Sequence, residues 1–146
     1  MHHHAVHNFH SSDISINDLV EDFIPEDDRD AGGLPRLLTL SIGTRVMLIR
    51  NIATGQGLIN GALGFVHAIE YENNVLIRVF VQFDDESIGR MFYNAEHNAI
   101  GIDAISQEFF CRGRSLYRTQ FPLLPAFEWD LQFRLRFVLL QPYASA

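Results

Sequence analysis

Apolar and β-branched residues from position 34 onward fall into short runs separated by glycine, asparagine and acidic residues. The clearest run, Val-Leu-Ile-Arg-Val-Phe-Val-Gln-Phe at 75–83, predicts a strand that the acidic residues at 84–86 end. Shorter runs at 45–49 and 64–69 predict two more strands, because turn-forming residues bound each of them. Strands of this length joined by tight turns favour a mainly β protein built as a small SH3-like antiparallel barrel, whose closure would remove exposed edges.

The strand pattern weakens beyond residue 88. We expect an irregular connection over 91–101, a short strand and turn over 102–110, and an extended segment over 115–124. Strict alternation of apolar and polar residues at 131–137 predicts a half-buried strand within an extended C-terminal tail. The apolar face of that strand would be a surface for self-association.

The N-terminal residues have a different composition from the rest. Residues 1–30 hold eight acids and one arginine, whereas ten arginines face ten acids from residue 31 onward, so the formal net charge of −7 comes almost entirely from the head. We expect an irregular, acidic and His-rich lead-in with a short helix over 14–24, and no ordered metal site. The resulting division is a lead-in at 1–33, a barrel at 34–87, a connection back at 88–127 and a divergent tail at 128–146.

Composition excludes several classes of protein. The 146 residues, 47% of them apolar, suit one domain with a substantial core, and no apolar run reaches the roughly 20 residues of a membrane helix. Cys111 is the single cysteine, which excludes a disulfide within the chain and favours an intracellular location. All eleven basic residues are arginine, so there is no P-loop lysine to contact ATP and no Schiff-base lysine.

Candidate catalytic and phosphate-binding motifs are weak. The glycine-rich stretch at 55–64 lacks the G-x-G-x-x-G spacing and a following helix, so its glycines, like the one at 43, are better explained by turns. No catalytic residues are predicted, because nothing places Cys111 beside His97, and the consecutive acids at 84–86 cannot share one face of a strand to bind a metal. The predicted structural turn glycines are Gly43, Gly57, Gly61 and Gly64.

Arginines beside aromatic residues are the better functional signal. Arg45 and Arg50 flank an apolar strand, and three further arginines at 112–118 lie among phenylalanine and tyrosine. Guanidinium groups bind phosphate oxygens, and aromatic rings stack on the bases of single-stranded nucleic acids. The alternative is that these arginines pair with acids on the protein surface.

Three segments in combination resemble the C-terminal region of Pif-family DNA helicases, including the helicase modules of Helitron-type transposons. The first, at 40–51, is a glycine turn followed by a Val-Met-Leu strand that ends in Arg-Asn. The second is Gly-Leu-Ile-Asn-Gly-Ala-Leu-Gly-Phe-Val at 57–66. The third, Arg-Thr-Gln-Phe-Pro-Leu at 118–123, resembles the segment that returns the family's chain to the motor core. The resemblance covers residues 34–127.

The resemblance implies the SH3-like insert in the second motor domain of an ATP-dependent 5′-to-3′ DNA helicase. It implies roles in DNA repair, recombination, telomere maintenance or transposition, a nuclear or mitochondrial location, and single-stranded DNA and the remaining motor domains as partners. By position, Arg50, Asn51 and Asn60 would lie nearest the DNA, although the two asparagines could instead satisfy backbone groups of turns. The full set of candidate DNA contacts is Arg45, Arg50, Asn51, Asn60, Arg112, Arg114 and Arg118.

The sequence also departs from the family. The Walker A and Walker B segments and the downstream motor motifs are absent, and the pattern is lost after residue 127. We therefore expect no cofactor in this chain, with ATP and magnesium bound by other segments of the parent enzyme, no ATP hydrolysis by the chain alone, and weak binding of DNA. Two alternatives stay open: a protein-interaction module with the same barrel, and a degenerate transposon relic without activity.

Overall fold

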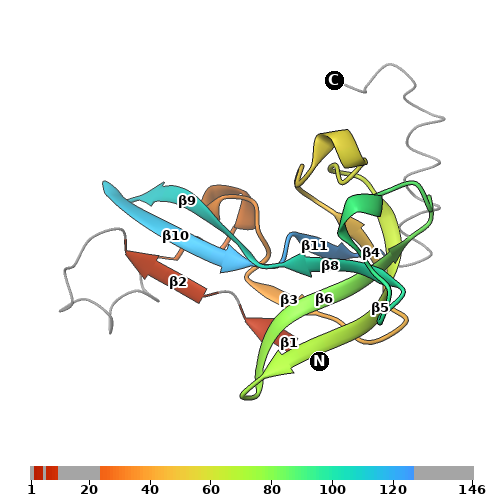
Figure 1. The fold of residues 1–146 in the computed structure, drawn as a ribbon. Helices are drawn as coiled ribbons and strands as arrows, with labels where there is room; N and C mark the ends of the chain where they lie inside the picture. The colour runs from red at the N-terminus through yellow and green to blue at the C-terminus, as the bar shows by residue number, and fades with distance from the viewer. Residues whose placement is uncertain (1, 5, 10–23, 127–146) are drawn as a thin grey trace.

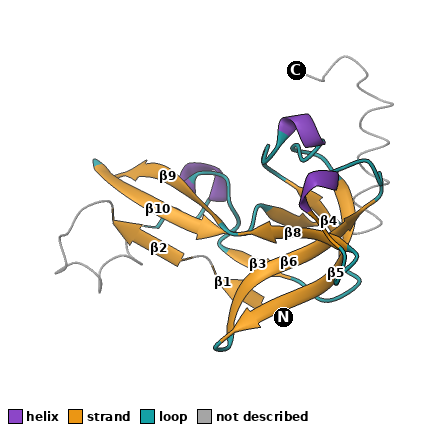
Figure 2. Cartoon of the chain, viewed as in Figure 1, coloured by secondary structure: helices purple, strands orange, loops and turns teal. Residues whose placement is uncertain are grey.

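Strands account for most of the regular structure (Figures 1 and 2). The structure, a computed structural model, describes residues 2–4, 6–9 and 24–126. The strands are β1 (His2–His4), β2 (Val6–Phe9), β3 (Leu37–Thr39), β4 (Arg45–Leu48), β5 (Leu63–Glu72), β6 (Val75–Phe83), β7 (Tyr93–Asn94), β8 (Ala99–Asp103), β9 (Ile105–Cys111), β10 (Arg114–Gln120) and β11 (Leu123–Pro125). The short 3₁₀ turns are η3 (Asp28–Ala31), η4 (Thr54–Gln56) and η5 (Arg90–Phe92). The mainly β prediction is confirmed.

The largest sheet has the strand order β11-β4-β5-β6-β8-β7, and its neighbouring strands are antiparallel. β5 and β6 are its longest strands and form a hairpin whose register shifts at two places, one of them between Val66 and Ala68. Strands β11 and β7 are the two edges of this sheet, so the described strands do not close on themselves. Closure into a barrel therefore stays a prediction.

β6 has the bounds that its sequence predicts, and its position explains its nearly continuous apolar run. It pairs with β5 on one side and with β8 on the other. Val79 and Val81 are fully buried in the main core, while Phe80 on the opposite face is covered by His97, with ring centroids 4.0 Å apart. A strand buried on both faces needs apolar residues at successive positions.

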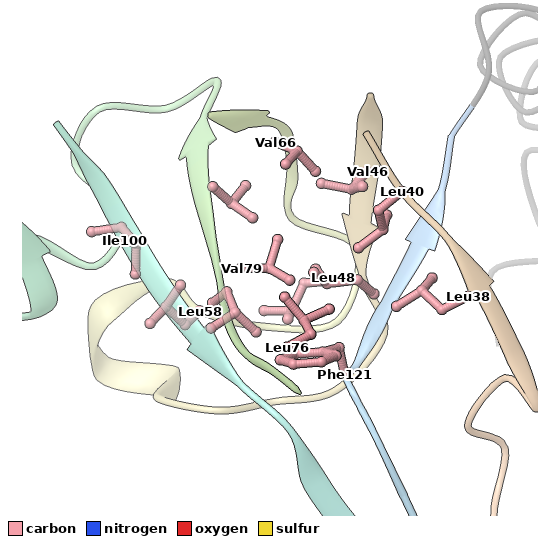
Figure 3. Packing of buried hydrophobic residues seen from close by; sticks show 13 residues of the cluster. Leu38, Leu40, Val46, Leu48, Leu58, Val66, Leu76, Val79, Ile100 and Phe121 are labelled. Atoms are coloured by element: carbon pink, nitrogen blue, oxygen red, sulfur yellow. The ribbon is translucent and has the colours of Figure 1, made fainter. Parts of the chain in front are cut away.

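The main core lies along one face of the six-stranded sheet (Figure 3). Leu48 of β4, Val66 of β5 and Val79 of β6 contribute to it from adjacent strands. Phe121, in the link between β10 and β11, is fully buried in the same cluster. Because this cluster takes side chains from positions 38 to 123, its formation requires residues that are distant in sequence.

A second, three-stranded sheet has the order β2-β10-β9. Only Ala104 separates β8 from β9, so the chain runs directly from the large sheet into the small one, and the β9–β10 hairpin projects away from the large sheet (Figure 1). A small apolar cluster of Ile24, Ala31, Phe109 and Leu116 covers one face of this hairpin.

The N-terminal lead-in is more regular than its composition predicts. β1 pairs with β3, and β2 pairs with β10, both in antiparallel register. Strand pairing uses backbone groups, which a polar, His-rich sequence supplies as well as an apolar one. The expected helix over 14–24 lies outside the described residues except for Ile24, and the tail strand at 131–137 lies wholly outside them.

The stretch at 91–101, expected to be irregular, contributes β7 and the start of β8 to the large sheet. β8 is stabilised by its pairing with β6, where Val79 lies opposite Ile102 and Phe80 opposite Gly101. A side chain at Gly101 would overlap Arg78, since its Cβ would lie 2.6 Å from Arg78 Cδ. The Arg78 side chain thus occupies the space beside Gly101 and would have to move to admit a side chain there. Within the described ranges, no helix has the length and hydropathy of a membrane span.

Candidate nucleic-acid interface

Two loops of the large sheet face each other across an open groove of about 740 Å³. The first loop, residues 49–62, joins β4 to β5, and the second, residues 84–92, follows β6. We call this hollow the loop groove. Gln56, Asn60 and Arg90 bring polar groups to it, while Ile59 and Met91 bring apolar surface. A groove with amide and guanidinium groups beside apolar side chains can contact both the phosphates and the bases of a nucleic acid.

Gln56 ties the two loops together. Its carbonyl accepts a hydrogen bond of 2.7 Å from the Gly89 amide, and its side-chain oxygen accepts one of 3.2 Å from the Met91 amide. These bonds hold the two walls of the loop groove at a fixed separation. The arrangement around η4 and η5 is therefore set by contacts between loops as well as by the strands that precede them.

Asn51 and Asn60 are brought together within the first loop. The Asn51 side-chain oxygen accepts a 2.9 Å hydrogen bond from the Asn60 amide, and the next amide, that of Gly61, donates to the Leu48 carbonyl at 2.7 Å. Asn51 therefore satisfies a backbone amide of the turn, which is the structural alternative considered for both asparagines. Asn60 is exposed and lines the loop groove, with its backbone fixed by these contacts.

Arg45 and Arg50 are engaged with groups of the protein. The Arg45 guanidinium makes a two-pronged ion pair with Asp84 and lies over the Phe65 ring, 4.6 Å from its centroid. The hydrogen bonds of this pair raise the pKa of Arg45 and lower that of Asp84. Arg50 is half-buried and donates to the carbonyls of Gly32 and Ile49.

The remaining predicted contacts lie on the small sheet. Arg112 and Arg114 are exposed at the turn of the β9–β10 hairpin, away from the loop groove (Figure 1). Arg118 has no exposed surface, and its guanidinium donates to Asp28 and to the Leu34 carbonyl. The structure thus brings Arg50, Asn51 and Asn60 together and separates them from the arginines at 112–118.

The predicted turn glycines occupy two kinds of position. Gly43, Gly57 and Gly61 have positive φ angles of 89°, 74° and 103° and lie between strands. Gly64 lies within β5, where the backbone of β6 passes so close that a Cβ would come within 2.4 Å of the Gln82 carbonyl oxygen. A side chain is excluded at this position by a neighbouring strand.

Arg90 is the residue of the loop groove that sequence reasoning missed. It is exposed in η5 and lines the same groove as Asn60. Asp85 lies there too, and its pKa is lowered mainly by hydrogen bonds from Ser87, with a smaller effect from the charge of Arg90. The available signal was an arginine following a run of acids, inside a stretch that has no strand pattern. In the part of the chain that the structure describes, no cluster of three or more His, Cys, Asp or Glu is placed to bind a metal.

Comparison with known proteins gives one family. Residues 30–69 match the family model described as "DNA helicase Pif1, 2B domain". The ATP-dependent DNA helicase PIF1 of Rattus norvegicus is 48% identical over 44 residues, which are 30% of this chain and 7% of the rat protein; the Mus musculus protein gives the same values. The matched stretch is therefore a small part of the curated relatives. The similarity confirms the resemblance to Pif-family helicases.

Solved structures of helicases are similar over most of the chain. The crystal structure of Pif1 helicase from Candida albicans has a TM-score of 0.50 and 19% identity, and the match covers 86% of this chain and 28% of that one. The structure of Pif1 helicase from Bacteroides in complex with ADP-AlF3 and single-stranded DNA has a TM-score of 0.47 and 22% identity, covering 86% and 24% of the two chains. The Candida structure supports the arrangement of strands; at this identity it concerns the fold alone.

Proposed function

We propose that this chain, a Pif1-like helicase segment by its match to the 2B domain, serves as an accessory module that contacts single-stranded DNA beside a helicase motor. The observation that carries the proposal is the loop groove, where Asn60 and Arg90 line one open surface next to exposed apolar side chains. The first wall of this groove, the loop at 49–62, lies within the matched residues, 30–69. Phosphate contacts by a guanidinium and stacking of bases on aromatic rings, such as the exposed Phe92 of the second loop, are the usual means of holding single strands.

Fewer residues contact DNA in this arrangement than the sequence predicts. Asn60 and Arg90 are its central residues, with Arg112 and Arg114 at the hairpin turn as an outlying pair of positive charges. Asn51 acts by fixing the Asn60 backbone. Arg45, Arg50 and Arg118 are left out of the DNA surface, because their guanidinium groups are held by protein partners.

The similarity to ATP-dependent DNA helicase PIF1 supports a proposal about the wider role. We propose that the parent enzyme is an ATP-dependent helicase that moves 5′ to 3′ and acts in DNA repair, recombination, telomere maintenance or transposition, in the nucleus or in mitochondria. The chain itself contributes contact with DNA, and ATP binding falls to other segments of the parent enzyme, since this chain contains no lysine for a P-loop. Its partners would be single-stranded DNA and the motor domains.

Binding of a fluorescently labelled oligothymidylate, followed by anisotropy at several salt concentrations, tests the DNA surface. We expect weak, salt-sensitive binding, which Arg90→Ala weakens several-fold while reducing the slope of log K against log salt by about 0.7, the value for one phosphate contact on a single strand. Arg29→Ala is the matched control, because it removes the same charge from a side chain that is 88% exposed on η3. Equal losses in both variants would show non-specific attraction and would reject the loop groove.

A second candidate is a protein-interaction module, and a separate observation favours it. Three consecutive residues at the end of the second loop and the start of β7 are exposed although apolar or aromatic: Met91 at 79%, and Phe92 and Tyr93 at 52% each. Such a run fits a protein surface as well as a nucleic acid. If Met91→Ser abolishes binding to a motor domain supplied separately, while Arg90→Ala leaves oligonucleotide binding unchanged, this second function is the correct one.

A further inference from the structure

Buried polar side chains fasten the segment that enters the large sheet to the segment that leaves it. Arg118 of β10 has no exposed surface, and its Nη1 donates to Asp28 Oδ1 at 2.6 Å and to the Leu34 carbonyl at 2.8 Å. A charge without access to water is costly unless it is paired and hydrogen-bonded. The Arg118–Asp28 contact, between residues 90 positions apart, is therefore a specific attachment.

A second arginine, in the loop after β4, also binds this segment. Arg50, which follows β4, donates through Nη2 to the Gly32 carbonyl and through Nη1 to the Ile49 carbonyl at 2.9 Å. Further along, the buried Gln120 side chain donates to the Pro35 carbonyl at 3.2 Å. The residues just before β3 are thus held by side chains of β10 and of the loop after β4, chiefly through their own backbone.

Apolar packing of this segment is unevenly distributed. Leu34 is fully buried with Met47 and Ile49, so the chain is anchored there by a core cluster. In η3 only Ala31 is buried, and it joins Ile24 in the small cluster over β9 and β10. Residues 24–33, which we call the latch segment, therefore depend on polar contacts more than the residues that follow.

We propose that Arg118 and Arg50 are positioning residues that latch residues 24–33 onto the β module, and that Asp28 is the releasable side of this latch. Asp28 can be released because its side chain is 44% exposed and water can solvate it once the ion pair breaks. Arg118 keeps the Leu34 carbonyl as a partner when Asp28 leaves, but its buried charge then lacks this ion pair, so the open form is a minor population. Opening would lift residues 24–33, which lie in sequence between β2 and β3, off the β9–β10 hairpin while the large sheet stays folded. This inference does not depend on DNA binding.

The single cysteine supplies a direct measure of opening. Cys111 is half-buried and packs against the cluster that contains Ile24 and Ala31, so its thiol becomes more accessible when the latch segment lifts. Thiol labelling of the intact chain with DTNB then reports the open population. Asp28→Asn removes the charge with little change of shape, and Asp30→Asn, exposed in the same 3₁₀ turn, changes the net charge equally.

We expect Asp28→Asn to label roughly 10- to 100-fold faster than the unaltered chain, the effect of losing a hydrogen bond between charged groups. Asp30→Asn should label within about twofold of the unaltered rate, as surface substitutions usually do. Arg50→Met, which keeps an unbranched side chain, should also label faster, and it tests the latch even if the Asp28 variant does not fold. Labelling unchanged in both variants would overturn the proposal.

Hydrogen exchange measured on the same proteins separates local opening from unfolding. The latch predicts faster exchange over residues 24–33 in Asp28→Asn, with β6 as protected as in the unaltered chain. Equal acceleration in the latch segment and in β6 would mean that Asp28 stabilises the whole fold, which would also overturn the proposal.

Discussion

Arg118 and Arg90 show how the position of a residue in the fold decides what its charge can do. Side chains alternate along β10, so Leu116, Arg118 and Gln120 share its buried face. The guanidinium of Arg118 donates hydrogen bonds to Asp28 and to the Leu34 carbonyl, whereas Arg90, in a short turn, is exposed at the loop groove. At the scale of the residue, backbone direction separates a structural arginine from one available to a ligand.

Gly64 gives the sharpest prediction about a single residue. A Cβ there would lie 2.4 Å from the Gln82 carbonyl oxygen and 2.7 Å from Val81 Cγ1, and backbone cannot yield as a flexible side chain can. We expect Gly64→Ala to lower the free energy of unfolding by about 1–3 kcal/mol, the usual range for overpacking. Gly55→Ala is the control, since nothing lies within 4 Å of its added methyl group, and should change stability by less than about 0.5 kcal/mol. Urea denaturation of both variants measures the difference.

The Arg45–Asp84 pair makes a prediction about pH. Its hydrogen bonds lower the pKa of Asp84 in the folded state below the unfolded value of about 3.9. The stabilisation is therefore complete above the unfolded pKa and is lost as pH falls through the folded pKa. Asp84→Asn should reduce stability at pH 7 by no more than about 1 kcal/mol, because the pair is partly exposed, and the difference should shrink with acidification.

Denaturation midpoints between pH 7 and pH 2 check this expectation. Glu86→Gln, exposed in the same loop, serves as the matched change of charge. A stability difference between Asp84→Asn and the unaltered chain that grew on acidification would show that the sign is wrong.

At the scale of the element, the β5–β6 hairpin is the main scaffold of the large sheet. Asn73 and Asn74 form its turn with positive φ angles of 51° and 65°. Two successive residues with positive φ match the right-handed twist of the flanking strands, and asparagine tolerates this geometry better than most residues with a side chain. The turn therefore sets the register beside it, with Glu72 opposite Val75, and the irregularity between Glu70 and Tyr71 then sets the register in which Val79 and Val81 enter the core.

Substitution at Asn74 tests the role of the turn. Asn74→Gly should keep or raise stability by up to about 1 kcal/mol, because glycine adopts positive φ without strain and Asn-Gly is the preferred pair. Asn74→Val should lower it by about 1–2 kcal/mol, the cost of placing a residue with a side chain in the left-handed region. Urea midpoints of the two variants should fall on opposite sides of the unaltered value, and a common direction would contradict the account.

At the scale of the whole molecule, the net charge differs from the charge of the region that forms the loop groove. The net charge of −7 opposes DNA binding at long range, but it comes from the first 30 residues, whereas the loop groove lies in the nearly neutral remainder. Binding by such a surface depends on a few short-range contacts. The two sheets are joined through the direct passage from β8 to β9 and through the short link from β10 to β11 at 121–122.

The composition predicts the behaviour of the purified chain toward ATP. Because no lysine is present to reach the β- and γ-phosphates, we expect no turnover of ATP above a buffer control, with or without single-stranded DNA. A coupled assay for ADP release measures this directly. Turnover that co-purifies with the chain through two different columns would contradict the assignment as an accessory module.

Much of the strand content could be predicted because local pattern and tertiary role agree there. The 75–83 run matches β6, and the runs at 45–49 and 64–69 correspond to β4 and β5. β8 was missed because it is short and contains Gly101, a residue that is uncommon in strands. Likewise, Asn51 and Asn60 were identified by resemblance, but no pattern in the sequence places Arg90 across the groove from them.

The sequence alone determined the chain's mainly β character, its lack of a lysine-dependent ATP site and its resemblance to Pif-family helicases, because these follow from local periodicity, composition and motif spacing. Only the tertiary structure decided which arginines are exposed and which are buried. That outcome depends on contacts between distant segments, such as Arg118 with Asp28 and Arg45 with Asp84. Burial and pairing are properties of a neighbourhood, and neighbours separated by 39 or 90 positions leave no local signal.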